Sequence, residues 1–115
     1  MDEVIRKVAA LGLPGVLLAI AIATTGFAGG AALTTALAAL GGPFGMIGGI
    51  AVLGIAGLVA DAVAKVGIDN FLVKVYCQRR QNEQHSKLLT EIGKLPVSDD
   101  LKNRLRLVVM NGNGC

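Results

Sequence analysis

Few side chains in this sequence could act as a nucleophile, a general base or a soft metal ligand: one histidine, His85, and two cysteines, Cys77 and Cys115. Cys77 and His85 are eight residues apart, which allows one face of a helix, but no carboxylate is evident to orient the imidazole. One histidine and two cysteines also fall short of the four ligands of a structural zinc site. We expect no catalytic residue, no metal site and no enzyme activity.

The two cysteines are too few and too far apart in the sequence to indicate a disulfide framework. We therefore expect two free thiols in a reducing compartment. The glycines lie among Leu, Ile and Ala without the lysine or the strand pattern of a nucleotide-binding loop. No cofactor is predicted.

Asp61 and Lys65 are the first charges after a long apolar run. An acidic residue four positions before a basic one is the favourable order for a helical ion pair. Charges at the end of a membrane span are candidates for a pore or an interface, and in a ring of subunits Asp61 would place carboxylates at the inner mouth. The alternative is that both side chains only reach the interfacial water.

The helices that carry Asp61 and Lys65 can be predicted from how the charged residues are distributed along the chain. The 115 residues are 53% apolar, and residues 8–60 contain no Asp, Glu, Lys, Arg or His. A small domain in water needs polar residues over most of its surface, whereas a lipid-facing segment does not. We call residues 8–60 the charge-free run.

Two apolar stretches, residues 14–40 and 44–66, are each long enough as helices to cross a hydrocarbon core of about 30 Å. The glycines and the proline at 41–45 break the helix between them. The sequence thus predicts an all-α integral membrane protein with a glycine-rich two-helix hairpin over residues 13–66 and a turn at 41–45.

The flanking segments are amphipathic. Residues 1–12 predict an interfacial helix that stops near Gly12, and Pro14 suits the first turn of the next helix. Residues 67–115 predict a basic helical tail that begins as a continuation of the second span, with an apolar stripe at Ile68, Phe71, Leu72, Val75 and Tyr76.

The last helix of the tail has its own start and stop signals. Ser98 is a good N-cap, and Asn111-Gly112 is the expected stop.

Small residues recur at the spacing of helix contacts. In lipid, the hydrophobic effect does not drive helices together. Their association depends instead on close packing, which small side chains permit. The glycines lie on more than one face of the second span, which is more than one partner helix requires. We therefore predict a homo-oligomer packed through Gly26, Gly30, Gly45, Gly49, Gly54 and Gly57.

Paired apolar segments with the series Gly41-x-x-x-Gly45-x-x-x-Gly49 resemble the glycine-zipper two-helix membrane proteins, and in general character the small glycine-rich membrane proteins that interferon induces in animals. The resemblance covers roughly residues 14–66. It implies self-association in membranes and, in some members, permeabilisation. It carries over no catalytic residue.

The chain from Asp61 onward, which includes the tail, holds nine Lys or Arg and six Asp or Glu. This excess suits an anionic bilayer surface, with Arg79 and Arg80 as the expected headgroup ligands. Nucleic acid is not an expected partner, because acidic residues are interleaved and aromatic residues are few. All eleven Lys and Arg lie at the two ends of the hairpin, so the positive-inside rule places both termini of this multi-pass protein in the cytoplasm.

Two functions fit these features. The first is a small oligomeric membrane protein that forms a pore or otherwise permeabilises the bilayer, as a toxic or defence effector does. The alternative is a membrane anchor or membrane-shaping scaffold that recruits a cytoplasmic protein partner through its C-terminal helices. A third arrangement buries the apolar faces between many subunits of a soluble or fibrillar assembly.

Overall fold

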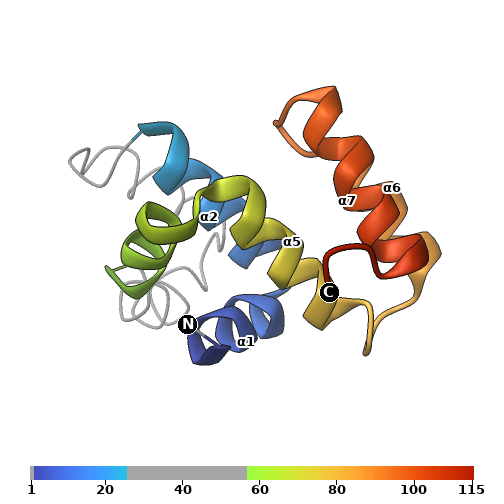
Figure 1. Cartoon of the computed structure of the whole chain (residues 1–115), viewed down its shortest axis with the longest axis horizontal. Coiled ribbons are helices and arrows are strands. Elements are labelled where there is room, and N and C mark those ends of the chain that lie inside the picture. The colour runs from blue at the N-terminus through green and yellow to red at the C-terminus, as the bar shows by residue number, and fades with distance from the viewer. Residues whose placement is uncertain (1, 26–56) are drawn as a thin grey trace, which may run out of the picture.

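A computed structural model describes residues 2–25 and 57–115 of the chain. The described residues form helices joined by short connections, without a strand, so the predicted all-α class is confirmed. The central helix separates an N-terminal pair of helices from a C-terminal pair (Figure 1). In chain order the labelled helices are α1 (Asp2–Leu11), α2 (Leu13–Thr25), α5 (Ile68–Arg79), α6 (His85–Gly93) and α7 (Asp99–Asn111).

The first two helices meet at a sharp bend. Gly12 ends α1 with a φ of +70°, a conformation that favours glycine, and α2 starts at once with Pro14 in its first turn. The axes of α1 and α2 are bent by 120°. Gly15 makes this bend possible, because a Cβ there would lie 2.4 Å from the carbonyl oxygen of Val8.

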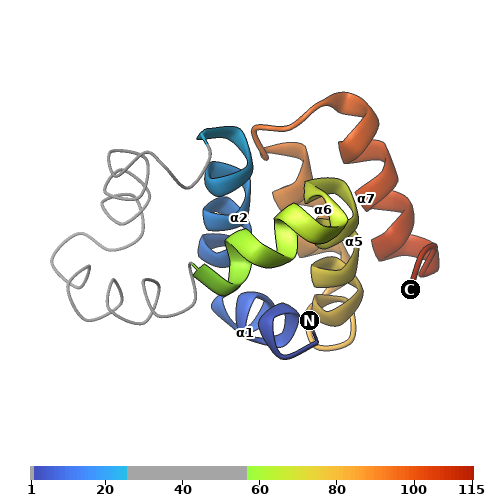
Figure 2. The same ribbon diagram turned by 60° about the vertical axis from the view of Figure 1, so that its left-hand side comes forward.

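A second glycine interrupts the chain before α5. Residues 57–66 are helical, Gly67 follows with a φ of +82°, and α5 begins at Ile68 (Figure 2). The prediction that α5 simply continues the second span is therefore wrong. The amide of Phe71 still donates to the carbonyl of Gly67 at 3.0 Å, so the chain re-enters a helix directly after the break.

The C-terminal helices begin and end where local chemistry predicts. The hydroxyl of Ser98 accepts a hydrogen bond from the amide of Leu101 at 3.2 Å, which caps α7. Gly112 closes α7 in the left-handed conformation, and its amide donates to the carbonyl of Val108. The predicted N-cap and stop of this helix are confirmed.

The hydrophobic core is built around α5. This helix contacts α1, α2 and α7, and α6 contacts α7. The predicted stripe of α5 is buried at four of its five positions, and Ile68 is partly buried. The largest side chains that are fully enclosed are Tyr76, Phe71, Leu18, Leu72, Leu88, Ile92 and Leu105.

Among the described helices, none is by itself both long and apolar enough to cross a membrane, and α1 with α2 would qualify only as a bent pair. The predicted hairpin over residues 13–66 stays a prediction. Its turn at 41–45, and its glycines Gly26, Gly30, Gly45, Gly49 and Gly54, lie outside the described residues.

Candidate functional site

The last turn of α5 and its C-cap residue, together residues 76–80, contact both C-terminal helices. Tyr76 and Arg79 are three positions apart, on one face of the helix, and reach α6. Cys77 and Arg80, also three positions apart, lie on the neighbouring face and reach the end of α7 and the residues after it.

The contact with α6 is a buried ionic network. The Nε of Arg79 donates to Glu83 at 2.6 Å, and its two terminal nitrogens donate to Glu91, with Nη2 at 3.0 Å from Oε1. The hydroxyl of Tyr76 donates to the same Glu91 carboxylate at 2.6 Å. The side chains of Arg79 and Glu91 are only 2% and 9% exposed, so the buried charge of Glu91 depends on Arg79 for its cation.

The pKa values in this network express the same coupling. Burial raises the pKa of Tyr76 above its ordinary value, and the adjacent Glu91 carboxylate adds to the effect. Burial opposes the charge on Arg79, but the hydrogen bonds to Glu83 and Glu91 outweigh it and raise the pKa of Arg79. The hydrogen bond from Arg79 lowers the pKa of Glu83. Tyr76 stays protonated and Arg79 stays charged near neutral pH.

Arg79 and Arg80 differ from the exposed headgroup ligands that the sequence suggested. The guanidinium of Arg79 is enclosed by two carboxylates and lies over the ring of Tyr76, 5.3 Å from its centroid. The Nε of Arg80 donates to the carbonyl oxygen of Val109 at 3.1 Å, and the residue is partly buried. In this structure, Arg79 binds a carboxylate of α6 and Arg80 binds a backbone carbonyl of α7, so both side chains connect helices.

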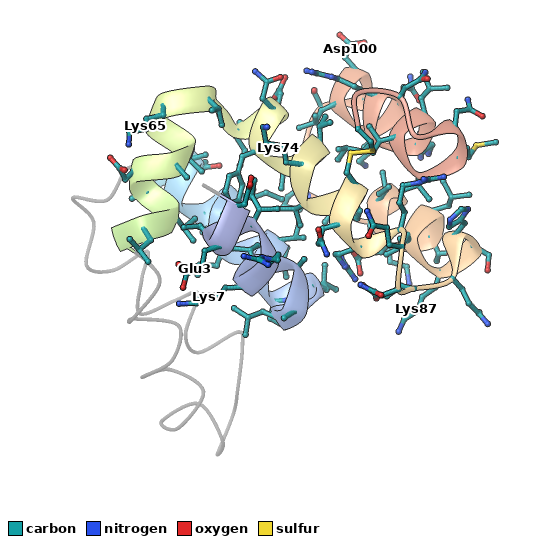
Figure 3. All side chains as sticks on the ribbon, turned by 60° about the horizontal axis from the view of Figure 1, so that its bottom comes forward. Glu3, Lys7, Lys65, Lys74, Lys87 and Asp100 are labelled. Carbon is teal, nitrogen blue, oxygen red and sulfur yellow. A yellow bond between two sulfur atoms is a disulfide. The ribbon has the colours of Figure 1, made fainter. Side chains whose placement is uncertain are left out.

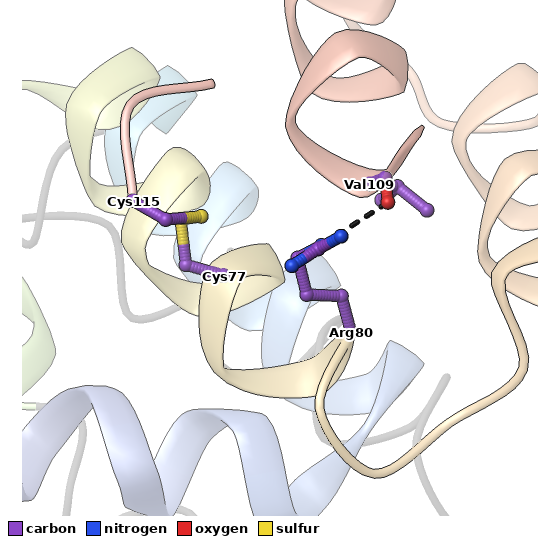
Figure 4. The surroundings of a disulfide bond; sticks show 4 residues. All are labelled: Cys77, Arg80, Val109 and Cys115. Atoms are coloured by element: carbon purple, nitrogen blue, oxygen red, sulfur yellow. Dashed lines mark hydrogen bonds between the residues drawn. A yellow bond between two sulfur atoms is a disulfide. The ribbon is translucent and has the colours of Figure 1, made fainter. Parts of the chain in front are cut away.

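The contact with the end of α7 is covalent. Cys77 and Cys115 form a disulfide with a Cα–Cα distance of 5.5 Å, beside the hydrogen bond from Arg80 (Figure 4). The prediction of two free thiols is therefore wrong. The cysteines are 38 residues apart in sequence, and they meet because α7 packs against α5 with its C-terminal end beside the C-terminal end of α5.

A local signal for this return is present after α7. Gly112 and Gly114 have φ values of +73° and +85°, and these two left-handed residues turn the chain toward α5. A Cβ at Gly114 would lie 3.1 Å from a methyl group of Val73, so the tail also runs close to the helix. The Asn-Gly-Asn-Gly sequence before Cys115 is this signal, which spacing alone does not reveal.

His85 lies away from any reactive partner among the described residues. Its Nε2 is 3.3 Å from the carbonyl oxygen of Arg80, and the residue is exposed. The sulfur of Cys77 is occupied by the disulfide. In the ranges 2–25 and 57–115, no three His, Cys, Asp or Glu side chains are grouped to hold a metal ion.

The residues predicted for a pore mouth lie on an exposed helix face. Asp61 and Lys65 form an ion pair at 3.1 Å, and their side chains are 66% and 67% exposed. Gly57 is one turn earlier on the same face, and a Cβ there would meet no atom of the described residues within 4 Å. The predicted ion pair is present, while its place at a membrane boundary stays a prediction.

Comparisons of the chain with protein-family models, with curated proteins and with solved structures give no match. The resemblance to glycine-zipper proteins stays a prediction.

Proposed function

We propose that the protein permeabilises membranes as a homo-oligomer, and that the described helices are its packed form before insertion. One observation carries this proposal: apolar side chains from both described ends of the charge-free run lie in the core, where Val16, Ala19 and Val59 have no exposed surface. Leu13 and Leu58 of the same run remain 38% and 48% exposed. Apolar segments avoid water either inside a protein or inside lipid. On insertion, these apolar segments would leave the protein core and enter the lipid.

The free energies make such an exchange feasible. Burying a Val or Leu side chain away from water is worth about 1.5–3 kcal/mol. Lipid tails are about as apolar as Leu. Moving these side chains from the protein core into lipid therefore changes the free energy of keeping them away from water only little. Smaller effects, such as attraction to an anionic surface and contacts between copies, then decide which form is populated.

The helix over residues 57–66 offers a surface for contacts between copies. Gly57, Asp61 and Lys65 share one exposed face, at positions i, i+4 and i+8. A glycine on this face permits close approach of a second helix, and the two charges would follow at the mouth of a ring.

The direct test is dye release from sealed liposomes that contain anionic lipid, with flotation to measure membrane association. We expect the full-length protein to float with the vesicles and to release the dye. Vesicles that stay sealed although the protein floats would reject permeabilisation, and failure to float would reject membrane insertion.

A glycine substitution tests assembly separately. A Cβ at Gly57 meets none of the residues that the structure describes, so we expect Gly57→Leu to leave the thermal unfolding temperature unchanged while it lowers the oligomer size and the dye release. Gly93→Leu at the end of α6 is the matched control, since its Cβ would meet only the end of Arg106 at 3.7 Å. Equal dye release by both variants would exclude a role of Gly57 in assembly.

One observation favours the alternative function of an anchor or scaffold. Leu107 and Met110 of α7 are 47% and 58% exposed and lie three positions apart on one face of this helix. An anchor would use such apolar side chains to bind a protein partner while the bilayer stays closed. Flotation without dye release is the result that this alternative predicts.

The side of the membrane is a separate question, because two physical arguments predict opposite answers. The positive-inside rule places α5, α6 and α7 in the cytoplasm, where thiols are kept reduced. The disulfide between Cys77 and Cys115 instead suits an oxidising compartment. Labelling of cysteines in intact cells with a membrane-impermeant thiol reagent, before and after reduction, distinguishes the two.

A further inference from the structure

We propose that a hollow between the helix over residues 57–66, α5 and α7 binds the phosphate group of an anionic lipid headgroup. The hollow has a volume of about 370 Å³. This inference rests on the proposed function, because it names the surface through which the packed form would meet the bilayer. The residues that line the hollow are Lys65, Val66, Asn70, Val73, Lys74, Arg104 and Gly114.

The charge of the hollow selects an anion. Its lining includes Lys65, Lys74 and Arg104, whereas none of the described residues that line it is acidic. In the described part of the chain, no carboxylate pairs with Lys74 or Arg104. Lys65 pairs with Asp61, but both side chains are about two-thirds exposed, and such a surface pair contributes little and exchanges readily.

A polar side chain orients the arginine. The amide nitrogen of Asn70 donates to the carbonyl of Val66 at 2.9 Å, so its amide oxygen faces the other way and accepts from Nη2 of Arg104 at 2.8 Å. The other N–H groups of this guanidinium have no partner among the described residues. A planar guanidinium held in this way can donate two parallel hydrogen bonds to a phosphate.

The location of the hollow favours a lipid headgroup over a free phosphate. Lys65 is the first basic residue after the charge-free run, so it marks where the chain would leave the hydrocarbon. Lys65 and Lys74 lie on the same side of the molecule, while Lys87 lies at the other end (Figure 3). A headgroup phosphate at the level of Lys65 would therefore have the cations of α5 and α7 beside it.

The test compares two charge-matched double variants in flotation with phosphatidylcholine vesicles, with and without phosphatidylglycerol. We expect Lys74→Gln/Arg104→Gln to lose about ten-fold or more of its partitioning onto the anionic vesicles, since each cation near such a surface contributes on the order of 1 kcal/mol. The control, Lys87→Gln/Arg106→Gln, removes the same charge outside the hollow. Lys74→Arg/Arg104→Lys keeps the charge and should retain most of the binding.

The outcomes separate the hollow from general electrostatics. A loss confined to the hollow variant, with unchanged thermal unfolding, supports the proposal. Equal losses in both double variants, or no loss in either, overturn it. Titration with glycerol phosphate, followed by NMR, covers the free ligand: binding of this ligand to the wild type, together with unchanged flotation of the hollow variant, overturns the assignment to a lipid.

Failure of this inference is distinguishable from failure of the proposed function. If the wild type releases dye and the hollow variant floats and releases dye equally well, only the headgroup site is rejected. If the wild type does not float at all, membrane insertion is rejected, and the titration with glycerol phosphate still reports whether the three cations bind a phosphate.

Discussion

Glu91 lies on α6 with its side chain 9% exposed, and it receives hydrogen bonds from both Arg79 and Tyr76. A buried carboxylate with two donors is stable only while the cation remains, because an unpaired charge in the core carries a large desolvation penalty. At the residue scale, the contact between α5 and α6 therefore depends on Arg79.

We expect Arg79→Ala to lower the free energy of unfolding by about 3–5 kcal/mol, because it leaves Glu91 without its cation. Chemical denaturation followed by circular dichroism measures this change. Arg6→Ala removes an exposed arginine of α1 and should change stability little. Similar effects of the two substitutions would mean that the ionic network does not stabilise the fold.

A second prediction concerns Glu83, whose pKa is lowered by the hydrogen bond from Arg79. A glutamate in the unfolded chain has a pKa of about 4.3. Since the folded-state value is lower, the stabilisation is fully present above the unfolded pKa and is lost as the pH falls through the folded-state pKa.

The Glu83→Gln variant tests this pH dependence. We expect its unfolding temperature to fall less steeply than that of the wild type below about pH 4.3. Glu3→Gln is the control, because Glu3 forms an exposed pair with Lys7 and should keep the steeper slope. Identical slopes for the wild type and Glu83→Gln would argue against this carboxylate as a source of the pH dependence.

At the element scale, the bend between α1 and α2 determines whether the start of the charge-free run lies against α5. Two glycines produce this bend: Gly12 supplies the left-handed residue, and Gly15 allows the first turn of α2 to approach the carbonyl of Val8. A straight continuation of α1 into α2 would remove this packing.

Gly15→Ala should disfavour the bend, because the added methyl group has no room beside the backbone of Val8. We expect a loss of about 1–3 kcal/mol of stability, typical of overpacking. If the packed form precedes insertion, dye release should also become faster. Gly93→Ala is the control, because its methyl group would meet the end of Arg106 at an ordinary 3.7 Å. Slower release by Gly15→Ala would contradict the proposed order of events.

At the scale of the whole molecule, the disulfide closes a loop of chain that contains the end of α5 and all of α6 and α7. The cysteines line a surface hollow of about 460 Å³ together with Asp2, Arg6 and Lys74, so a dithiol reagent can approach the bond. We therefore expect the stability of the C-terminal helices to depend on redox state as well as on packing.

Reduction of this bond should lower the stability of the protein by about 4 kcal/mol, from the entropy of closing a loop of 38 residues. Urea denaturation with and without dithiothreitol measures the difference. A Cys77→Ser/Cys115→Ser variant should match the reduced wild type and be insensitive to the reductant. Overlapping curves for all samples would show that the crosslink does not stabilise the molecule.

Local chemistry in the sequence was sufficient for the junction of α1 with α2 and for the two ends of α7. Gly12 and Pro14, and likewise Ser98 and Gly112, act through hydrogen bonds and backbone angles within a few residues, so their effects are independent of distant parts of the chain. The amphipathic stripe of α5 was predictable for the same reason, since helix periodicity alone places its apolar residues on one face.

The tertiary structure decided everything that joins residues far apart in sequence. The pairing of Cys77 with Cys115, and the burial of Arg79 against Glu91, require helices to return to α5, and no spacing rule encodes that return. The break at Gly67 is local, since its φ is +82°, but the apolar periodicity of the flanking residues does not reveal it. Composition describes how apolar a segment is, but only packing determines whether protein covers it.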